Sequence, residues 1–202
     1  MRRTYKILYR TLAPLLKVLF RVHGHGQENE PPTGTSFVVC ANHISELDPI
    51  CINIVLGKTE PYYMAKAELF KIPILRGLLK NVFHAFPVKR GGSDLAAIRK
   101  TGEILSEGGC IGIFPQGTRC RGVEIEDTEF KTGASLIVSK NQADVLPVRV
   151  VMKKNRWCLF RRIDIYVGEM IKFEELGYDK TDRDSYSKMA QIIKNKICEL
   201  GK

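Results

Sequence analysis

The residues best suited to chemistry in this sequence are a histidine and an aspartate five positions apart, His43 and Asp48. An imidazole titrates near neutral pH, so it can accept a proton from an alcohol at little cost. A nearby carboxylate can fix the tautomer of the ring and stabilise the imidazolium as it forms. The pair therefore indicates a general base with its orienting partner, acting on a substrate hydroxyl.

Two elements must position this pair. The apolar, β-branched run at 36–40 predicts a buried strand, and the apolar segment at 49–56 predicts a helix that ends at a glycine. His43 is thus expected just past a strand end. Between the pair, Ser45 is interpreted as a cap of the following helix and Glu46 as a solvated carboxylate at its start.

Two further polar turns follow predicted strands, and both suit an anion. Lys89 and Arg90 precede two glycines and a predicted helix start, where the backbone can approach an anion closely. Arginine offers a planar fork that matches phosphate oxygens, and lysine offers a point charge. Gly117, Thr118 and Arg119 combine a small residue, a hydroxyl and a guanidinium. A histidine and two anion-binding turns in one small domain indicate a phosphorylated substrate.

Strands alternate with helices along the rest of the chain. This alternation predicts an α/β fold with a mostly parallel central sheet flanked by helices. Sites in such sheets gather where strands end, so the polar turns are expected to share one cleft. The predicted strands span 62–65, 83–88, 110–114, 144–151 and 162–167, and the predicted helices include 94–107, 132–139 and 185–200.

The N-terminal segment predicts an amphipathic helix over 5–22, with leucines on one side and Lys and Arg on the other. Charges interrupt it too often for it to span a bilayer. Such a helix suits the interface of an anionic membrane, although helices of this pattern also pack on their own domain. We expect 1–22 to be an N-terminal helical segment and 23–202 to form the α/β domain.

Composition limits the possible partners. The chain has 202 residues and a formal net charge of +10, which draws it to polyanions such as anionic lipid, nucleic acid or phosphorylated small molecules. Its six cysteines contain no C-x-x-C pair, and the H-x-H pair His23 and His25 lacks an evident third ligand, so no metal site is expected. G-x-S-x-G is absent, so a covalent acyl-enzyme is not indicated.

Four blocks resemble the 1-acyl-glycerol-3-phosphate acyltransferase family, the glycerolipid acyltransferases with an N-H-x-x-x-x-D box. They stand in family order at 42–48, 86–90, 114–119 and 145–148. The resemblance implies transfer of a fatty acyl group from an acyl-CoA or acyl-carrier-protein thioester to the 2-hydroxyl of lysophosphatidate, giving phosphatidate. It implies no cofactor, since acyl-CoA or acyl-carrier protein acts as a co-substrate. It also implies that the protein is a peripheral or monotopic protein at the cytoplasmic face of the cell membrane.

The resemblance also implies residue roles. His43 is the general base and Asp48 its partner, while Gln116 and Asn42 contact the acceptor. The family usually has glutamate at position 116, and an amide keeps an acceptor oxygen but loses the charge and cannot act as a base. The acceptor phosphate is bound by five residues, namely Lys89, Arg90, Gly117, Thr118 and Arg119.

Two alternatives stay open at this point. If the charge of the family's glutamate is essential, the acceptor here differs, for example glycerol-3-phosphate or another lysolipid. The basic charge alone also fits a non-catalytic module that binds a membrane or nucleic acid, but this leaves the histidine box unexplained. We therefore expect lysophosphatidate, an acyl-CoA or acyl-carrier protein and an anionic membrane surface as partners, and no nucleic acid.

Overall fold

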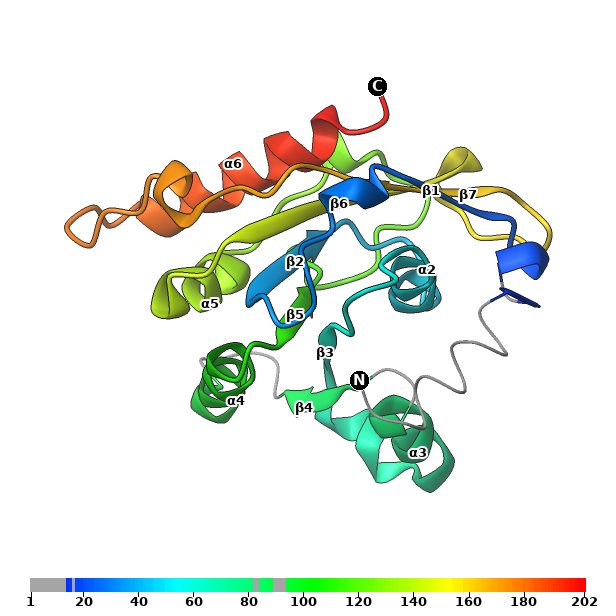
Figure 1. Cartoon of the computed structure of the whole chain (residues 1–202), viewed down its shortest axis with the longest axis horizontal. Coiled ribbons are helices and arrows are strands. Elements are labelled where there is room, and N and C mark those ends of the chain that lie inside the picture. The colour runs from blue at the N-terminus through cyan, green and yellow to red at the C-terminus, as the bar shows by residue number, and fades with distance from the viewer. Residues whose placement is uncertain (1–13, 16, 82–83, 89–93) are drawn as a thin grey trace.

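The computed structural model describes residues 14, 15, 17–81, 84–88 and 94–202. Seven strands form one sheet, in the order β1-β7-β6-β2-β5-β3-β4 (Figure 1). The strands are β1 (Val22–His25), β2 (Phe37–Ala41), β3 (Tyr62–Lys66), β4 (Phe86–Val88), β5 (Cys110–Ile113), β6 (Val145–Met152) and β7 (Ile163–Val167).

The five strands from β6 to β4 run parallel to one another. At the other edge β7 pairs antiparallel with β6, and β1 runs parallel to β7. Parallel strands with intervening helices are the arrangement expected from alternating strand and helix patterns. The prediction of an α/β fold with a mostly parallel sheet is therefore confirmed.

Helices cover both faces of the sheet. The α-helices are α2 (Asp48–Val55), α3 (Pro73–Asn81), α4 (Leu95–Ser106), α5 (Gly133–Asn141) and α6 (Ser185–Glu199). The side chains of β2 alternate in direction, so Val38 and Cys40 pack with α4, α5 and α6, whereas Phe37 and Val39 pack with α2. Short 3-10 turns are η1 (Gln27–Asn29), η2 (Ala67–Lys71), η3 (Ile125–Asp127), η4 (Lys153–Asn155) and η5 (Phe173–Leu176).

The start of α2 places a carboxylate where the site needs it. The sequence pattern predicts this helix from position 49, and the structure begins it one residue earlier, at Asp48. Pro49 lies in the first turn, where its missing N–H costs no hydrogen bond. The helix therefore presents the Asp48 side chain toward the chain that precedes it.

Most of the predicted N-terminal helix lies outside the described residues. Residues 14, 15 and 17–19 are helical, whereas Val22 already belongs to β1, so the helix does not extend to position 22 as predicted. Val22 is held in the strand by its pairing with Ile163 of β7. No helix in the described ranges is both long and apolar enough to cross a bilayer.

Candidate active site

His43 and Asp48 lie together at the carboxyl end of β2. The His43 ring nitrogen Nδ1 is 2.8 Å from Asp48 Oδ2. Because Oδ2 is an acceptor, Nδ1 carries the proton in the neutral ring, and Nε2 is left with a free lone pair. The pair therefore has the tautomer that a general base requires, and its geometry agrees with the sequence prediction.

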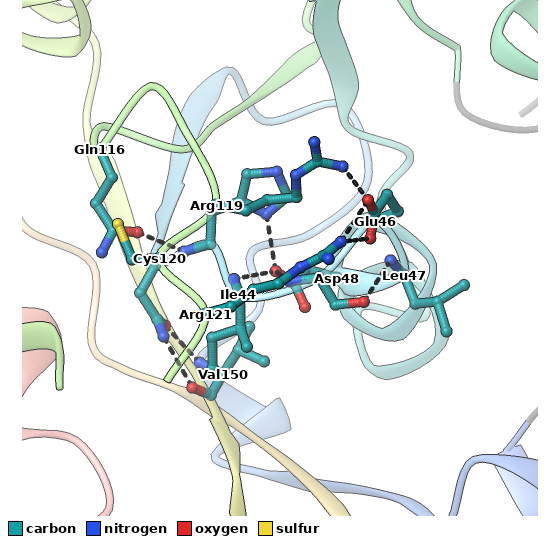
Figure 2. Close-up of polar contacts among 12 residues, drawn as sticks. Ile44, Glu46, Leu47, Asp48, Gln116, Arg119, Cys120, Arg121 and Val150 are labelled. Atoms are coloured by element: carbon teal, nitrogen blue, oxygen red, sulfur yellow. Dashed lines mark hydrogen bonds and ion pairs between the residues drawn. The ribbon is translucent and has the colours of Figure 1, made fainter. Parts of the chain in front are cut away.

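Asp48 is buried and locked by the chain that precedes it. Its side chain is 0% exposed, whereas that of His43 is 18% exposed. Oδ2 also accepts hydrogen bonds from the backbone N–H groups of Ile44, at 2.6 Å, and Ser45, at 2.8 Å (Figure 2). Ser45 Oγ accepts from Leu47 N at 3.3 Å, within the turn that precedes the helix. The N-cap of α2 is Leu47 and has no side-chain cap bond, so the prediction that Ser45 caps this helix is wrong, because Asp48 Oδ2 binds the backbone of the turn instead. These bonds fold the 43–48 turn around the carboxylate.

Gln116 supports the histidine from the other side. Its Oε1 accepts a hydrogen bond from His43 N at 2.6 Å, and its Nε2 donates to Thr128 Oγ1 at 2.8 Å. The Thr128 hydroxyl in turn donates to the carbonyl of Ile125 at 2.8 Å. Gln116 is buried, and both ends of its amide are bound to protein. In this structure it positions the backbone of the histidine, and its predicted contact with the acceptor stays a prediction.

Asn42 continues the sheet beyond the end of β2. Its side-chain amide donates to the carbonyl of Val150 at 2.9 Å and accepts from the N–H of Val150 at 2.7 Å. Cys120 N donates to the carbonyl of His43 at 2.8 Å, which ties the loop after β5 to the same turn. The histidine turn is thus anchored to β6 on one side and to the 114–121 loop on the other. The predicted acceptor contact of Asn42 also stays a prediction.

An aromatic stack sets the plane of the His43 ring. The ring of Phe114 lies 4.0 Å from that of His43, centroid to centroid, with 17° between the planes. Tyr63 stacks behind Phe114 at 5.9 Å and 15°, and its hydroxyl donates to Asn53 Oδ1 at 2.9 Å. Offset stacking of this kind limits the tilt of the imidazole.

Two arginines converge on one carboxylate beside the pair. Arg119 Nη1 bonds Glu46 Oε1, and Arg121 Nη2 lies 2.5 Å from Oε1 and 2.6 Å from Oε2 (Figure 2). Partial burial by itself would raise the pKa of Glu46. Its own backbone N–H and the two guanidinium groups lower that pKa by more, so it lies below the ordinary value. Glu46 is therefore a half-exposed carboxylate that carries its charge between two cations.

The predicted phosphate-binding residues are only partly placed. Lys89 and Arg90 lie outside the described residues. Gly117 has a left-handed φ of +68°, which favours glycine, and Thr118 and Arg119 are exposed at the mouth of the site. The structure thus brings Arg119 to the histidine turn, because β2 and β5 are hydrogen-bonded neighbours with Cys40 opposite Ile113.

Four contributors to the site were missed by sequence reasoning: Tyr63, Phe114, Arg121 and Thr128. Phe114 and Arg121 flank the predicted anion turn, so their position beside it was a usable signal. Tyr63 and Thr128 belong to segments with no polar motif, and only the folded chain brings them to the site. Glu46 was expected to be solvated, and the structure adds its two arginine partners.

Comparisons with known proteins agree with this geometry. A family model described as Acyltransferase matches residues 21–151. A 1-acyl-sn-glycerol-3-phosphate acyltransferase of Bacillus subtilis is 28% identical over 199 residues, which cover 96% of this chain and 96% of that protein. A protein of the same name from Borreliella burgdorferi is 33% identical over 132 residues, or 64% of this chain and 51% of its own length.

A solved structure shares the fold. The crystal structure of PlsC, the 1-acyl-sn-glycerophosphate acyltransferase from Thermotoga maritima, superposes with a TM-score of 0.64 at 22% identity. The match covers 98% of this chain and 83% of that one. Because the family model matches well over half of the sequence, and its range contains the histidine turn and the arginine loop, this chain belongs to the acyltransferase family.

Proposed function

We propose that this chain transfers a fatty acyl group from a thioester, of coenzyme A or of an acyl-carrier protein, to the 2-hydroxyl of 1-acyl-glycerol-3-phosphate. The product is phosphatidate, made at the cytoplasmic face of the membrane. The observation that carries the proposal is the 2.8 Å bond between His43 Nδ1 and the buried Asp48, which leaves Nε2 as a base. The names of the relatives support the choice of acceptor.

The proposed reaction needs one base and no covalent intermediate. His43 Nε2 takes the proton of the acceptor hydroxyl as its oxygen attacks the thioester carbonyl carbon. The tetrahedral intermediate then collapses, the C–S bond breaks, and the leaving thiolate takes the proton from the imidazolium. Asp48 stabilises the imidazolium between these two steps. Backbone N–H groups near the strand ends are our proposal for stabilising the oxyanion.

The acceptor phosphate is held, in this proposal, by Arg119 with Lys89, Arg90, Gly117 and Thr118. Arg119 bonds Glu46 through Nη1, and a guanidinium has five N–H donors, so the others remain for phosphate oxygens. Fixing the phosphate determines which hydroxyl reaches Nε2, and such positioning supplies a large part of the rate.

The proposal is tested by His43→Ala, with a turnover assay that pairs both thioester donors with lysophosphatidate. We expect the variant to fold and to lose acyl transfer. The control is His25→Ala. His25 Nε2 also lies 2.8 Å from an aspartate, Asp164, but His25 belongs to β1, the strand at the edge of the sheet away from the site. Full turnover in His43→Ala would reject the proposed mechanism.

A second acceptor is favoured by one observation, the uncharged amide at Gln116. The candidates are glycerol-3-phosphate and other lysolipids. An acceptor panel with one labelled donor separates the two proposals, since product with glycerol-3-phosphate and none with lysophosphatidate would support the second.

A further inference from the structure

A loop of unusual composition joins β6 to β7. We call residues 153–162 the cationic loop, because five of its ten residues are lysine or arginine and none is acidic. Between these cations the loop exposes three large apolar side chains. Trp157 is 40% exposed, Leu159 46% and Phe160 60%. Exposed aromatic and aliphatic groups among unopposed cations are typical of a surface that binds an anionic bilayer.

The backbone of the cationic loop is held in shape. Lys154, Asn155 and Phe160 have left-handed φ angles of 59°, 45° and 60°, a conformation that few residues with side chains adopt. Arg161 Nη1 donates to the carbonyl of Lys153 at 3.3 Å, across the base of the loop. The exposed apolar side chains thus project from an ordered turn.

The cations of the loop are largely unneutralised. Arg162 is paired with Asp164, at 2.7 Å. Within the described part of the chain, no carboxylate lies at ion-pair distance from Lys153, Lys154 or Arg156. Their charge is therefore available to an anionic partner.

The cationic loop adjoins the active site. A hollow of about 390 Å³ is lined by Arg156 and Trp157 of the loop and by Ser45, Glu46 and Arg121 of the site. Gly122 N also donates to the carbonyl of Asn155 at 2.8 Å, which joins the two loops directly.

The N-terminal segment extends the same apolar surface. The ring of Phe20 lies 6.0 Å from that of Trp157, edge to face. Leu15 and Val18, which precede Phe20 by five and two residues, are 60% and 75% exposed. The loop, the mouth of the site and the end of the N-terminal segment therefore form one continuous region.

We propose that the cationic loop docks the protein on an anionic phospholipid bilayer. Trp157, Leu159 and Phe160 enter the interface, and the surrounding Lys and Arg bind lipid headgroups. Docking in this way turns the hollow beside Glu46 and Arg121 toward the lipid surface, from which a lysolipid acceptor can enter. This last step rests on the proposed function, whereas the docking itself does not.

The chain supplies its own reporter, because Trp157 is its single tryptophan. Vesicles of phosphatidylcholine with about a third phosphatidylglycerol should shift its emission to shorter wavelengths and protect it from acrylamide, and pure phosphatidylcholine should do so far less. Leu159→Ser with Phe160→Ser should reduce both effects at least fivefold. An unchanged emission spectrum with anionic vesicles would overturn the proposal.

A charge variant tests the headgroup contacts by vesicle sedimentation of the full chain. Lys153→Glu with Lys154→Glu should lower the vesicle-bound to free ratio at least tenfold. The matched control is Lys180→Glu with Arg183→Glu, which changes net charge equally on the exposed turn before α6, at the opposite end of the molecule (Figure 1). The vesicle-bound to free ratio of this control should stay within twofold of that of the wild type. An equal loss of vesicle binding in both double variants would mean that net charge alone attracts the protein, and would overturn the specific docking site.

Two further readouts separate the competing explanations. With lysophosphatidate in vesicles, Lys153→Glu with Lys154→Glu should lose turnover, whereas with a short-chain acceptor dissolved as monomers it should keep it. A wild type that shows the emission shift but no turnover with either acceptor would leave docking in place and reject the proposed function. If Leu159→Ser with Phe160→Ser abolishes a dimer seen by light scattering and leaves vesicle binding unchanged, the surface binds a second copy and the docking proposal is wrong.

Discussion

At the scale of single residues, Asp48 combines two roles in one oxygen. Oδ2 accepts from the ring of His43 and from the N–H groups of Ile44 and Ser45. In the proposed mechanism the negative charge of Asp48 stabilises the imidazolium, whereas its hydrogen bonds to the backbone N–H groups shape the turn. Substitution can separate the two, because asparagine keeps an acceptor oxygen and loses the charge.

We therefore predict that Asp48→Asn lowers kcat on the order of 10³-fold with little change in stability. Asp48→Ala should lower kcat as much and also cost about 2–3 kcal/mol of unfolding free energy, because two buried N–H groups lose their acceptor. Steady-state kinetics and urea unfolding measure the two effects. Turnover of Asp48→Asn within tenfold of the wild type would mean that Asp48 only shapes the turn.

Gln116 is a positioning residue in the structure, and its kinetics can be told from those of an acceptor contact. Gln116→Ala removes the acceptor of His43 N and should lower kcat about 10–100-fold with little change in the acceptor KM. Gln116→Glu restores an acceptor oxygen and should stay within about tenfold of the wild type. The opposite pattern, a raised acceptor KM at unchanged kcat, would place the side chain on the substrate instead.

At the scale of elements, Tyr63 of β3 lies over Gly112 of β5. A Cβ added at Gly112 would stand 2.3 Å from Tyr63 Cε1, and Tyr63 is buried beneath the Phe114 ring that stacks on the histidine. The absence of a side chain at position 112 is thus part of how β3, β5 and α2 support the site.

Gly112→Ala should therefore cost about 1–3 kcal/mol of unfolding free energy and lower kcat, since the displaced tyrosine shifts the stack. Gly77→Ala in α3 is the control, because no atom lies within 4 Å of its added Cβ. That variant should keep full activity and gain up to about 1 kcal/mol, as alanine favours a helix interior. Equal unfolding midpoints for the two variants would contradict this packing argument.

At the scale of the whole molecule, the carboxyl and amino ends of the parallel strands differ in what they hold. The carboxyl ends of β2 and β5 carry the site. At the amino ends, the buried side chain of Glu30 joins the segment that precedes β2 to the segment that precedes β3. Its Oε1 accepts hydrogen bonds from Lys58 N at 2.9 Å and from the N–H and the hydroxyl of Thr59, each at 2.8 Å.

We predict that Glu30→Ala costs about 3 kcal/mol of unfolding free energy, because it leaves these buried donors without an acceptor. The turnover of the folded protein should stay within twofold of the wild type. Glu28→Ala, an exposed carboxylate in the same turn, should change stability by less than about 0.5 kcal/mol. A large loss of kcat in Glu30→Ala would show that the amino ends of the strands also shape the site.

The histidine turn shows how far local sequence patterns reach. The bond from His43 to Asp48 spans five positions, and the start of a helix after a strand nearly fixes its geometry. Likewise, either Ser93 or Asp94 suits the start of the helix predicted over 94–107, and in the structure Asp94 caps α4 by accepting from Ala97 N at 3.1 Å. Hydrophobic periodicity and helix capping involve residues only a few positions apart, so both can be recognised in the sequence.

Tertiary structure alone decided what surrounds that turn. The support from Gln116 spans 73 positions and the bond from Asn42 to Val150 spans 108. Trp157 lines the hollow beside the site although the four strands β3 to β6 separate its loop from the histidine turn in the chain. These contacts depend on the strand order β6-β2-β5, which hydrophobic periodicity does not encode. Short-range spacing was enough to predict that His43 pairs with Asp48 and that the fold is α/β, since both depend on residues close together in the chain. Which side chains support His43, and which loop lies beside it, depended on the long-range packing of the sheet.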